Sequence, residues 1–286
     1  MDLRVVANPR SYATHLASVV CFLSTFAGHW PTRNERAEFS YKHDHIRYAP
    51  TLRYYLQVHF RCYKCPTSLS EGMGTDGLVC KRERGQIASG IFEETRISIF
   101  GTLSTGSTNP PFYRVLILGD KDIDFTYCPE LPKGLEYRNG LDGTIVFQSA
   151  VVMTVGIWEL EWNKVLDQID NCLRIDLDEI LDRDKLATWM FDDNFERSAL
   201  YFAILQLLRI FGDCISTVSD DLHYLDSLFI REKGSFFPSK SMSPDEVQVM
   251  KSNWKSVLDV QEKAAKKLTE RLMAKTEEVK SLRDGV

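Results

Sequence analysis

The chain has 286 residues, of which 44% are hydrophobic and 26% are charged, a composition typical of a soluble globular protein with one large or two ordinary domains. Its net charge of −5 and the lack of a basic segment exclude the electrostatic footprint of a nucleic-acid-binding protein. No run of 18 or more apolar residues occurs, so the sequence predicts no transmembrane helix within these 286 residues.

The first half of the chain is expected to form a sheet with one or two N-terminal helices. Leu16 to Ala27 is interpreted as a buried amphipathic helix, and the alternative is the core of a short signal peptide. Alternating side chains from Leu52 to Tyr63 predict a half-buried strand. Further strands are predicted at three β-rich runs: Arg96–Leu103, Tyr113–Leu118 and Thr144–Val155.

The hydrophobic period becomes helical from residue 156 onwards. Trp158 to Leu173 predicts a first helix, and a short acidic helix is expected near Asp176 to Trp189. Asp193-Asn-Phe-Glu196 resembles a capping box that opens a long apolar helix ending at about Arg231. Residues 233–242 are expected to be a linker to the last helix.

The last helix has the most complete start signal in the chain. Ser243 is suited to cap the free N–H groups, Pro244 fits the first helical position, and Glu246 completes a capping box. No further proline and no glycine occurs before Arg283, so one continuous helix is predicted from 244 to 283. A helix of this length usually reaches a partner outside its own domain; the alternative is a long core helix.

The predicted fold class is α+β. We expect a sheet-containing region over residues 1–155, with a mixed sheet and helices, and a helical region over residues 156–286. Long antiparallel helices and a C-terminal stalk helix, residues 243–284, make up the second region.

Three short motifs resemble metal-binding or nucleotide-binding sites, but their sequence context does not favour such a site. Cys62, Cys65 and Cys80 lack a fourth zinc ligand, and the seven scattered cysteines favour a reducing compartment. His43-Asp44-His45 is interpreted as solvated polar residues rather than as a metal site. Gly72-Met-Gly74-Thr-Asp-Gly77 has dinucleotide spacing, but a loop rather than a strand precedes it. Because no nucleophile has a catalytic signature around it, we expect no enzymatic activity.

A group of acidic residues is a more promising candidate for a functional site. Residues 156–232 carry 17 acidic and 7 basic side chains, a local net charge of −10. Carboxylates grouped in this way favour hard cations such as Mg²⁺, held weakly through water and sensed in the millimolar range. The alternative is an ordinary solvated surface that provides solubility and helix caps. The candidate metal ligands are Asp176, Asp178, Glu179, Asp182, Asp220 and Asp221.

Several segments of the second half resemble the C-terminal half of filamentous-fungal CorA-like proteins. The resemblance covers about residues 156–286, and its segments are Trp158-Glu-Leu-Glu-Trp162, Asp193-Asn-Phe-Glu-Arg-Ser198, Leu205-Gln-Leu-Leu-Arg209, Asn253-Trp254 and Lys275-Thr-Glu-Glu-Val279. In CorA-type magnesium channels, a cytosolic sheet-plus-helix domain precedes a long stalk helix that continues into the first of two membrane spans. The subunits form a pentamer, and Mg²⁺ between the cytosolic domains holds the pore closed. Their Gly-Met-Asn pore tripeptide does not occur in this sequence.

The resemblance implies a non-catalytic cytosolic domain of a CorA-like divalent-cation transporter-type membrane protein. Its partners would be divalent cations, here weakly bound regulatory Mg²⁺, and further copies of the chain. A pentamer and membrane attachment would require spans beyond residue 286, so this chain is expected on the cytoplasmic side of a membrane. The alternative is a soluble cytoplasmic interaction or signalling module without transport activity.

Overall fold

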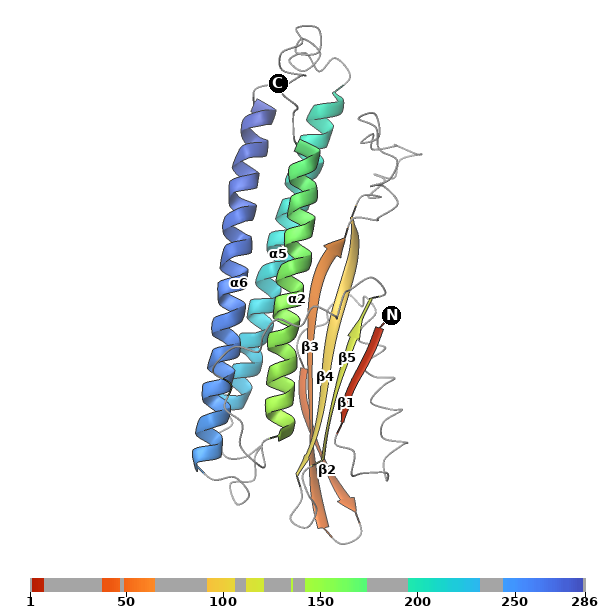
Figure 1. Ribbon diagram of the computed structural model, residues 1–286, viewed down its shortest axis with the longest axis vertical. Coiled ribbons are helices and arrows are strands. Elements are labelled where there is room, and N and C mark those ends of the chain that lie inside the picture. Colours follow the sequence, from red (N-terminus) through yellow and green to blue (C-terminus); the bar gives the residue numbers. More distant parts are fainter. Residues whose placement is uncertain are drawn as a thin grey trace. The chain divides into compact units, whose positions relative to one another are not determined.

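The computed structural model describes residues 2–7, 38–46, 49–64, 92–105, 112–120, 135, 142–173, 195–231 and 244–284 (Figure 1). They form five strands and three long helices, namely β1 Asp2–Ala7, β2 Glu38–Ile46, β3 Ala49–Lys64, β4 Glu93–Thr105, β5 Phe112–Gly119, α2 Asp142–Leu173, α5 Glu196–Arg231 and α6 Pro244–Asp284. The α+β class is therefore confirmed.

Two compact units make up the chain, and each helix contributes to both. Unit 1 contains Met1–Arg61, Arg96–Trp158 and Thr217–Ala264. Unit 2 contains Cys62–Thr95, Glu159–Ser216 and Ala265–Val286. The expected domain boundary after residue 155 falls inside α2, which continues without a break to Leu173.

The sheet has the strand order β1-β5-β4-β3-β2, and the pairings β1 with β5, β2 with β3 and β4 with β5 are all antiparallel. The expected mixed sheet is wrong for these three pairings. Short connections explain two of the pairings, β2 with β3 and β4 with β5, since Ile46 pairs with Ala49 across the β2–β3 link and a parallel neighbour would need a long crossover. The two edge strands, β1 and β2, were not predicted from the sequence.

In unit 1 one face of the sheet packs against α2. Leu56, Val58 and Phe60 of β3 are fully buried, as their alternation predicts. The ring of Phe60 lies edge-on to Trp158 at 6.4 Å, and the indole Nε1 of Trp158 donates a hydrogen bond of 2.8 Å to the carbonyl of Arg61. This hydrogen bond satisfies the indole N–H, the one polar group of a side chain that is otherwise surrounded by apolar atoms.

The opposite face of the sheet also carries buried side chains, so the prediction of a half-buried β3 is only partly right. Phe100, Leu116 and Leu118 form an apolar cluster against which Tyr55 packs. On the same face His59 is 4% exposed, and its Nδ1 lies 2.7 Å from the hydroxyl of buried Ser98. The hydrogen bond explains how a histidine is tolerated at a position that the alternation assigned to solvent.

The predicted strand at Thr144–Val155 is wrong, because these residues belong to α2. The run is rich in β-branched residues, which is typical of strands, but a helix buried on most of its circumference needs apolar residues at almost every position. Ile145, Val151 and Val155 are fully buried in this helix. Contacts with the sheet and with α6 therefore override the local β propensity.

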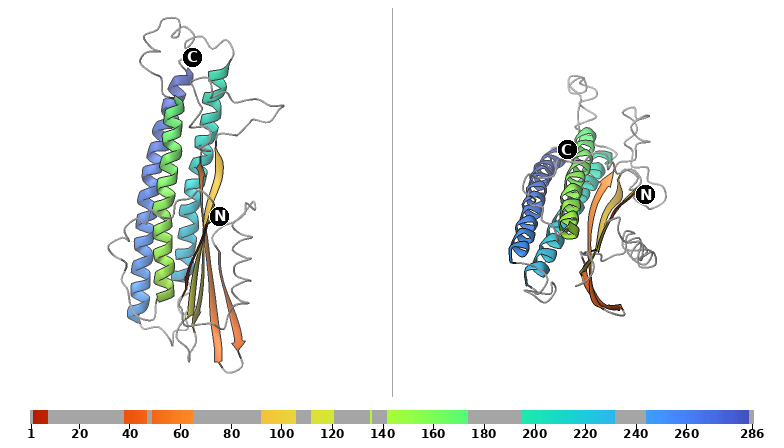
Figure 2. Two further views of the ribbon diagram at one scale, coloured as in Figure 1. Left: turned by 45° about the vertical axis from the view of Figure 1, so that its right-hand side comes forward. Right: turned by 60° about the horizontal axis from the view of Figure 1, so that its bottom comes forward.

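The two later helices match the prediction closely. α5 ends at Arg231, and α6 continues through Gln261 for 41 residues without interruption. In each unit α5 runs opposite to α2 and α6, which are parallel to each other (Figures 1 and 2). The expectation of antiparallel helices therefore holds for α5 against each of the other two helices. Because the chain reverses direction after α2 and again after α5, α2 and α6 run the same way.

Some predicted features lie outside the described residues, namely the Leu16–Ala27 helix, the short acidic helix near Asp176–Trp189, Cys65, Cys80 and the glycine motif from Gly72 to Gly77. His43 and His45 lie in β2, where alternate residues share one face.

Gly101 provides a test of the packing between the sheet and α2. A Cβ at this position would lie 2.7 Å from Cδ2 of the buried Phe147 ring. We expect Gly101→Ala to lower the free energy of unfolding by about 1–3 kcal/mol, because the ring has to move within a packed core. Urea denaturation measures the change.

Gly212 of α5 is the matched control for this substitution, since nothing lies within 4 Å of a Cβ built there. Gly212→Ala should leave stability unchanged or raise it by up to about 1 kcal/mol, because alanine is the better helix former. Equal losses at both glycines would contradict the role of the Phe147 contact.

Candidate functional site

Of the six predicted metal ligands, the structure describes only Asp220 and Asp221. Asp176, Asp178, Glu179 and Asp182 lie outside the described residues. Asp220 and Asp221 are successive residues of α5, and Asp220 is exposed whereas Asp221 is 3% exposed. Among the residues with described side chains, no group of three or more His, Cys, Asp or Glu is placed to hold a metal ion.

A nearby carboxylate on α5 is also poorly suited to a cation site. Burial raises the pKa of Asp226 above its ordinary value, and the neighbouring charge of His223 offsets only part of this effect. A carboxyl group whose charged form is disfavoured by desolvation is a weaker ligand for a hard cation than an exposed one.

The best-defined polar constellation of the described residues is a row of ion pairs between α2 and α6 in unit 2, here called the α2–α6 charge seam. At its centre Nη2 of Arg271 lies 2.5 Å from Oδ1 of Asp167 and 2.6 Å from Oδ2 of Asp170. Nη1 of the same guanidinium donates to the side-chain oxygen of Asn163 at 3.1 Å. The charge seam therefore centres on one arginine that joins three α2 residues.

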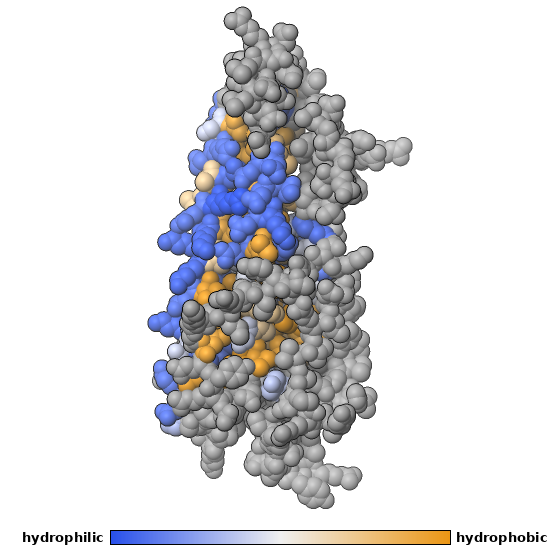
Figure 3. All heavy atoms as spheres, in the orientation of Figure 1, coloured by the Kyte–Doolittle hydropathy of each residue, from blue (hydrophilic) through white to orange (hydrophobic). Residues whose placement is uncertain are grey.

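Lysines extend the charge seam on both sides of Arg271. Nζ of Lys267 lies 3.2 Å from Glu159, and Nζ of Lys275 lies 2.6 Å from Asp170. Figure 3 shows hydrophilic side chains gathered over α2 and α6 in this region. The members of the charge seam are Glu159, Asn163, Asp167 and Asp170 on α2, and Lys267, Arg271 and Lys275 on α6.

Sequence spacing explains why the charge seam forms. Its residues recur every three or four positions on each helix and therefore share one face of that helix. Because α2 and α6 are parallel, both rows advance in the same direction and stay in register. Asp167 and Asp170 are three positions apart and share a face of α2, but their partners on α6 were not predicted from the sequence. The equal spacing of Lys267, Arg271 and Lys275 was the available signal.

The pKa values of the charge seam show that its members stabilise one another. Burial alone would raise the pKa of Asp170, but hydrogen bonds from Lys275 and Arg271 outweigh it and leave the pKa below its ordinary value. For Arg271, burial would lower the pKa, but hydrogen bonds to Asp167 and Asp170 raise it instead. These carboxylates are already neutralised by cations of the same chain, so the charge seam holds two helices together rather than a metal.

Beside the charge seam, four aromatic rings form the core of unit 2. Phe211 of α5 lies 5.0 Å from Trp162 and 4.9 Å from Tyr63, and Phe92 lies edge-on to it at 5.8 Å. Trp162 and Phe211 are fully buried. Such clusters provide much of the burial that holds a small core together, which is a structural rather than a chemical role.

Comparison of the chain with protein-family models, with curated proteins and with solved structures found no match.

By length and composition, two helices of the described chain are suited to cross a membrane, Gly143–Leu173 and Arg197–Ser227. Core helices of globular proteins meet the same criteria, so the finding is weak. In α2, 67% of the most apolar window is buried inside the protein, against 33% in α5. The sequence predicted no such helix, because neither window is free of polar residues.

Replacing Arg271 tests the charge seam. Arg271→Met should lower the free energy of unfolding at neutral pH by about 1–2 kcal/mol, because Asp167 and Asp170 are left close together without the cation between them. The folded-state pKa of Asp170 is lowered, so its contribution is present above about pH 4 and lost as the pH falls through the folded-state value.

The difference between wild type and Arg271→Met should therefore shrink in acid, as measured by urea denaturation at neutral pH and at about pH 3. Arg283→Met is the control, because Arg283 pairs only with the adjacent Asp284 in the described structure. A loss for Arg283→Met as large as that for Arg271→Met would contradict the central position of Arg271.

Proposed function

We propose that this chain is the non-catalytic cytosolic domain of a CorA-like divalent-cation transporter-type membrane protein. In this proposal the sheet and the three helices lie on the cytoplasmic side of a membrane, and α6 is the stalk. The observation that carries the proposal is the continuity of α6 over 41 residues. At 1.5 Å per residue such a helix is about 60 Å long, more than a small domain needs for its own core.

The ends of the helices in unit 2 also favour this proposal. Leu173, where α2 ends, and Glu196, where α5 begins, lie at the same end as the last turn of α6 at Asp284 (Figures 1 and 2). A continuation of α6 would therefore begin near the two points between which the chain carries Asp176 to Asp182.

The charge seam narrows the choice of cation-sensing residues. Asp167 and Asp170 are engaged by Arg271 and Lys275, and a divalent cation would have to displace those partners before it could bind. The acidic segment that includes Asp176, Asp178 and Asp182 is thus the better candidate. Weak binding through water matches the preference of Mg²⁺ for a largely retained hydration shell.

A second candidate function is a helical interaction module without transport activity. The observation in its favour is the exposure of large apolar side chains on α5, where Phe202 is 61% exposed. Exposed apolar side chains that cluster on one surface commonly mark a protein–protein contact. The two proposals differ in their response to divalent cations.

Thermal unfolding with and without Mg²⁺ tests the sensing role. Millimolar Mg²⁺ should raise Tm by about 2–4 °C, because a ligand of the folded state stabilises it by mass action. Replacing Asp176, Asp178 and Asp182 together by asparagine should abolish this rise. The matched control replaces three exposed acidic residues elsewhere, Asp213→Asn, Asp259→Asn and Glu270→Gln, and should keep it. The absence of any rise in the wild type would favour the interaction module.

Sedimentation with Mg²⁺ and with EDTA tests assembly. Without membrane spans, the chain should be monomeric or weakly associated at micromolar concentration. Mg²⁺ should shift it toward larger oligomers if carboxylates of two copies share one ion, because the ion relieves their mutual repulsion. A tight dimer that responds to neither Mg²⁺ nor EDTA would argue for the interaction module.

A further inference from the structure

The hairpin of β2 and β3 keeps its charged and its apolar residues on opposite faces of the sheet. Residues that are directly opposite each other in the register share one face, and the face alternates from one pair to the next. The pairs Lys42–Arg53 and Asp44–Thr51 lie on the outer face. Fully buried Leu56, by contrast, belongs to the face that packs against α2. In the hairpin this α2 face consists of Phe39, Tyr41, His43 and His45 of β2 and Pro50, Leu52, Tyr54 and Leu56 of β3.

Two histidines occur among the apolar and aromatic residues of the α2 face. His43 is paired with Leu52, and His45 is paired with Pro50. None of the residues on this face of the hairpin is Asp, Glu, Lys or Arg, so the register supplies no ionic partner for an imidazole from the same face. A histidine that serves only to solvate an antiparallel hairpin would be expected on the outer face, with the charged residues.

The strand gives the two histidines a fixed geometry. Residues two apart in a strand lie on one face, with their Cα atoms roughly 7 Å apart. Imidazoles at two such positions are long enough to bring one nitrogen each to a single ion, whose bonds to histidine nitrogen are about 2.1 Å long. In a loop the same spacing fixes no such geometry. The strand therefore changes the interpretation of His43-Asp44-His45 as solvated polar residues.

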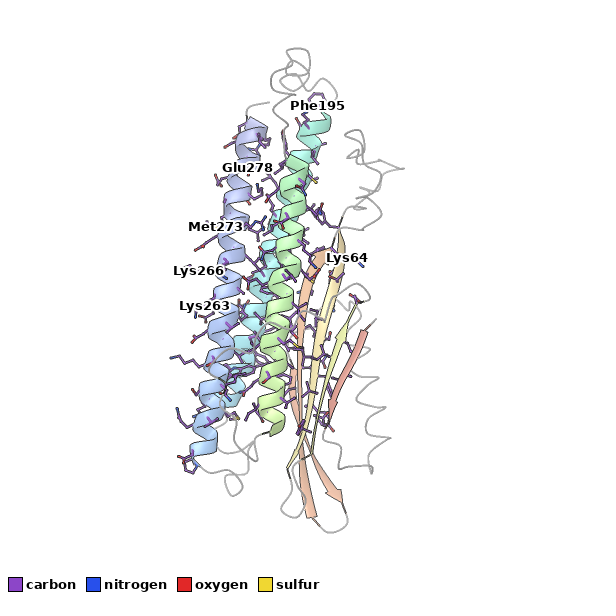
Figure 4. The ribbon with its side chains drawn as sticks, in the orientation of Figure 1. Lys64, Phe195, Lys263, Lys266, Met273 and Glu278 are labelled. Atoms are coloured by element: carbon purple, nitrogen blue, oxygen red, sulfur yellow. The ribbon has the colours of Figure 1, made fainter. Side chains whose placement is uncertain are left out.

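The histidine pair lies where the α2 face continues past the helix. The indole of Trp158 bonds to the carbonyl of Arg61, so these two residues are level with each other. Leu52 precedes Arg61 by about 30 Å of strand, whereas Asp142, the first residue of α2, precedes Trp158 by only about 24 Å of helix. Figure 1 shows the hairpin extending beyond the first turn of α2, and Lys64 marks the far end of β3 (Figure 4). Helix α2 therefore leaves this part of the face uncovered.

From this arrangement we propose that His43 and His45 form a two-histidine site for a divalent transition-metal ion, with Zn²⁺ as the ion of reference. Imidazole nitrogen suits Zn²⁺, Cu²⁺ and Ni²⁺, whereas Mg²⁺ prefers oxygen ligands. Since β2 is the last strand of the sheet order, only one strand borders the pair. Water completes the coordination of the ion.

The site is independent of the proposed function. It uses nitrogen ligands on a hairpin of unit 1, and no residue of the acidic segment takes part. Millimolar Mg²⁺ should therefore not compete for it. The variant with asparagine at 176, 178 and 182, which tests Mg²⁺ sensing, should bind Zn²⁺ as the wild type does.

Isothermal titration of the metal-free chain with Zn²⁺, in millimolar Mg²⁺, tests the site. His43→Ala and His45→Ala should each weaken one micromolar site by about tenfold or more, because disturbing even a partner of a metal ligand has an effect of this size. Cysteine thiols bind Zn²⁺ equally in every variant, so the difference from the wild type isolates the histidines. His223→Ala is the matched control. It removes a histidine of α5 that lies 3.2 Å from Glu262, and it should bind as the wild type does.

Two rescue variants test the strand geometry, both built on His45→Ala. Adding Tyr41→His places the second histidine two residues from His43 on the same face and should restore binding. Adding Asp44→His restores the number of histidines but places the new one on the outer face, so binding should stay weak. Circular dichroism checks that each variant keeps its fold. Equal Zn²⁺ binding by wild type and His43→Ala, an equal loss in His223→Ala, or equal rescue by the two additions would each overturn the proposal.

Discussion

The ring of Phe147 on α2 occupies the space that a Cβ at Gly101 of the sheet would fill, and this close approach fixes the architecture of unit 1. Once α2 lies this near to the sheet, its other side is available to α6, where Gln148 donates a hydrogen bond of 3.0 Å to the carbonyl of Met250. The helix is then enclosed between two neighbours. This enclosure explains why residues with strand propensity are helical here, and why α2 can be apolar without being a membrane span.

In unit 2, ion pairs between α2 and α6 hold the two helices together, and this changes how the acidic composition of the sequence is interpreted. The carboxylates of Asp167 and Asp170 are matched by cations of α6, and the match sets the parallel register of the two helices. A row of acidic residues in the sequence is therefore not by itself a cation site. The proposal of cation sensing therefore concerns carboxylates outside the charge seam, above all those of Asp176, Asp178 and Asp182.

The apolar surface of α5 contrasts with these two well-matched contacts. In α2 the apolar side chains are covered by the sheet and by α6, whereas in α5 the side chain of Phe202 is 61% exposed. Uncovered apolar area of this kind is costly in water and favours association.

The sequence by itself determined the elements whose signals are local: the α6 helix with its capped start and lack of breakers, the end of α5 at Arg231, and the alternation in β3. The tertiary structure alone decided what depends on contacts between distant segments. The helical state of Thr144–Val155 follows from enclosure, and the partner of Asp167, Arg271, lies about a hundred residues away on α6. Propensity and spacing act over a few residues, so they cannot specify which face meets which neighbour.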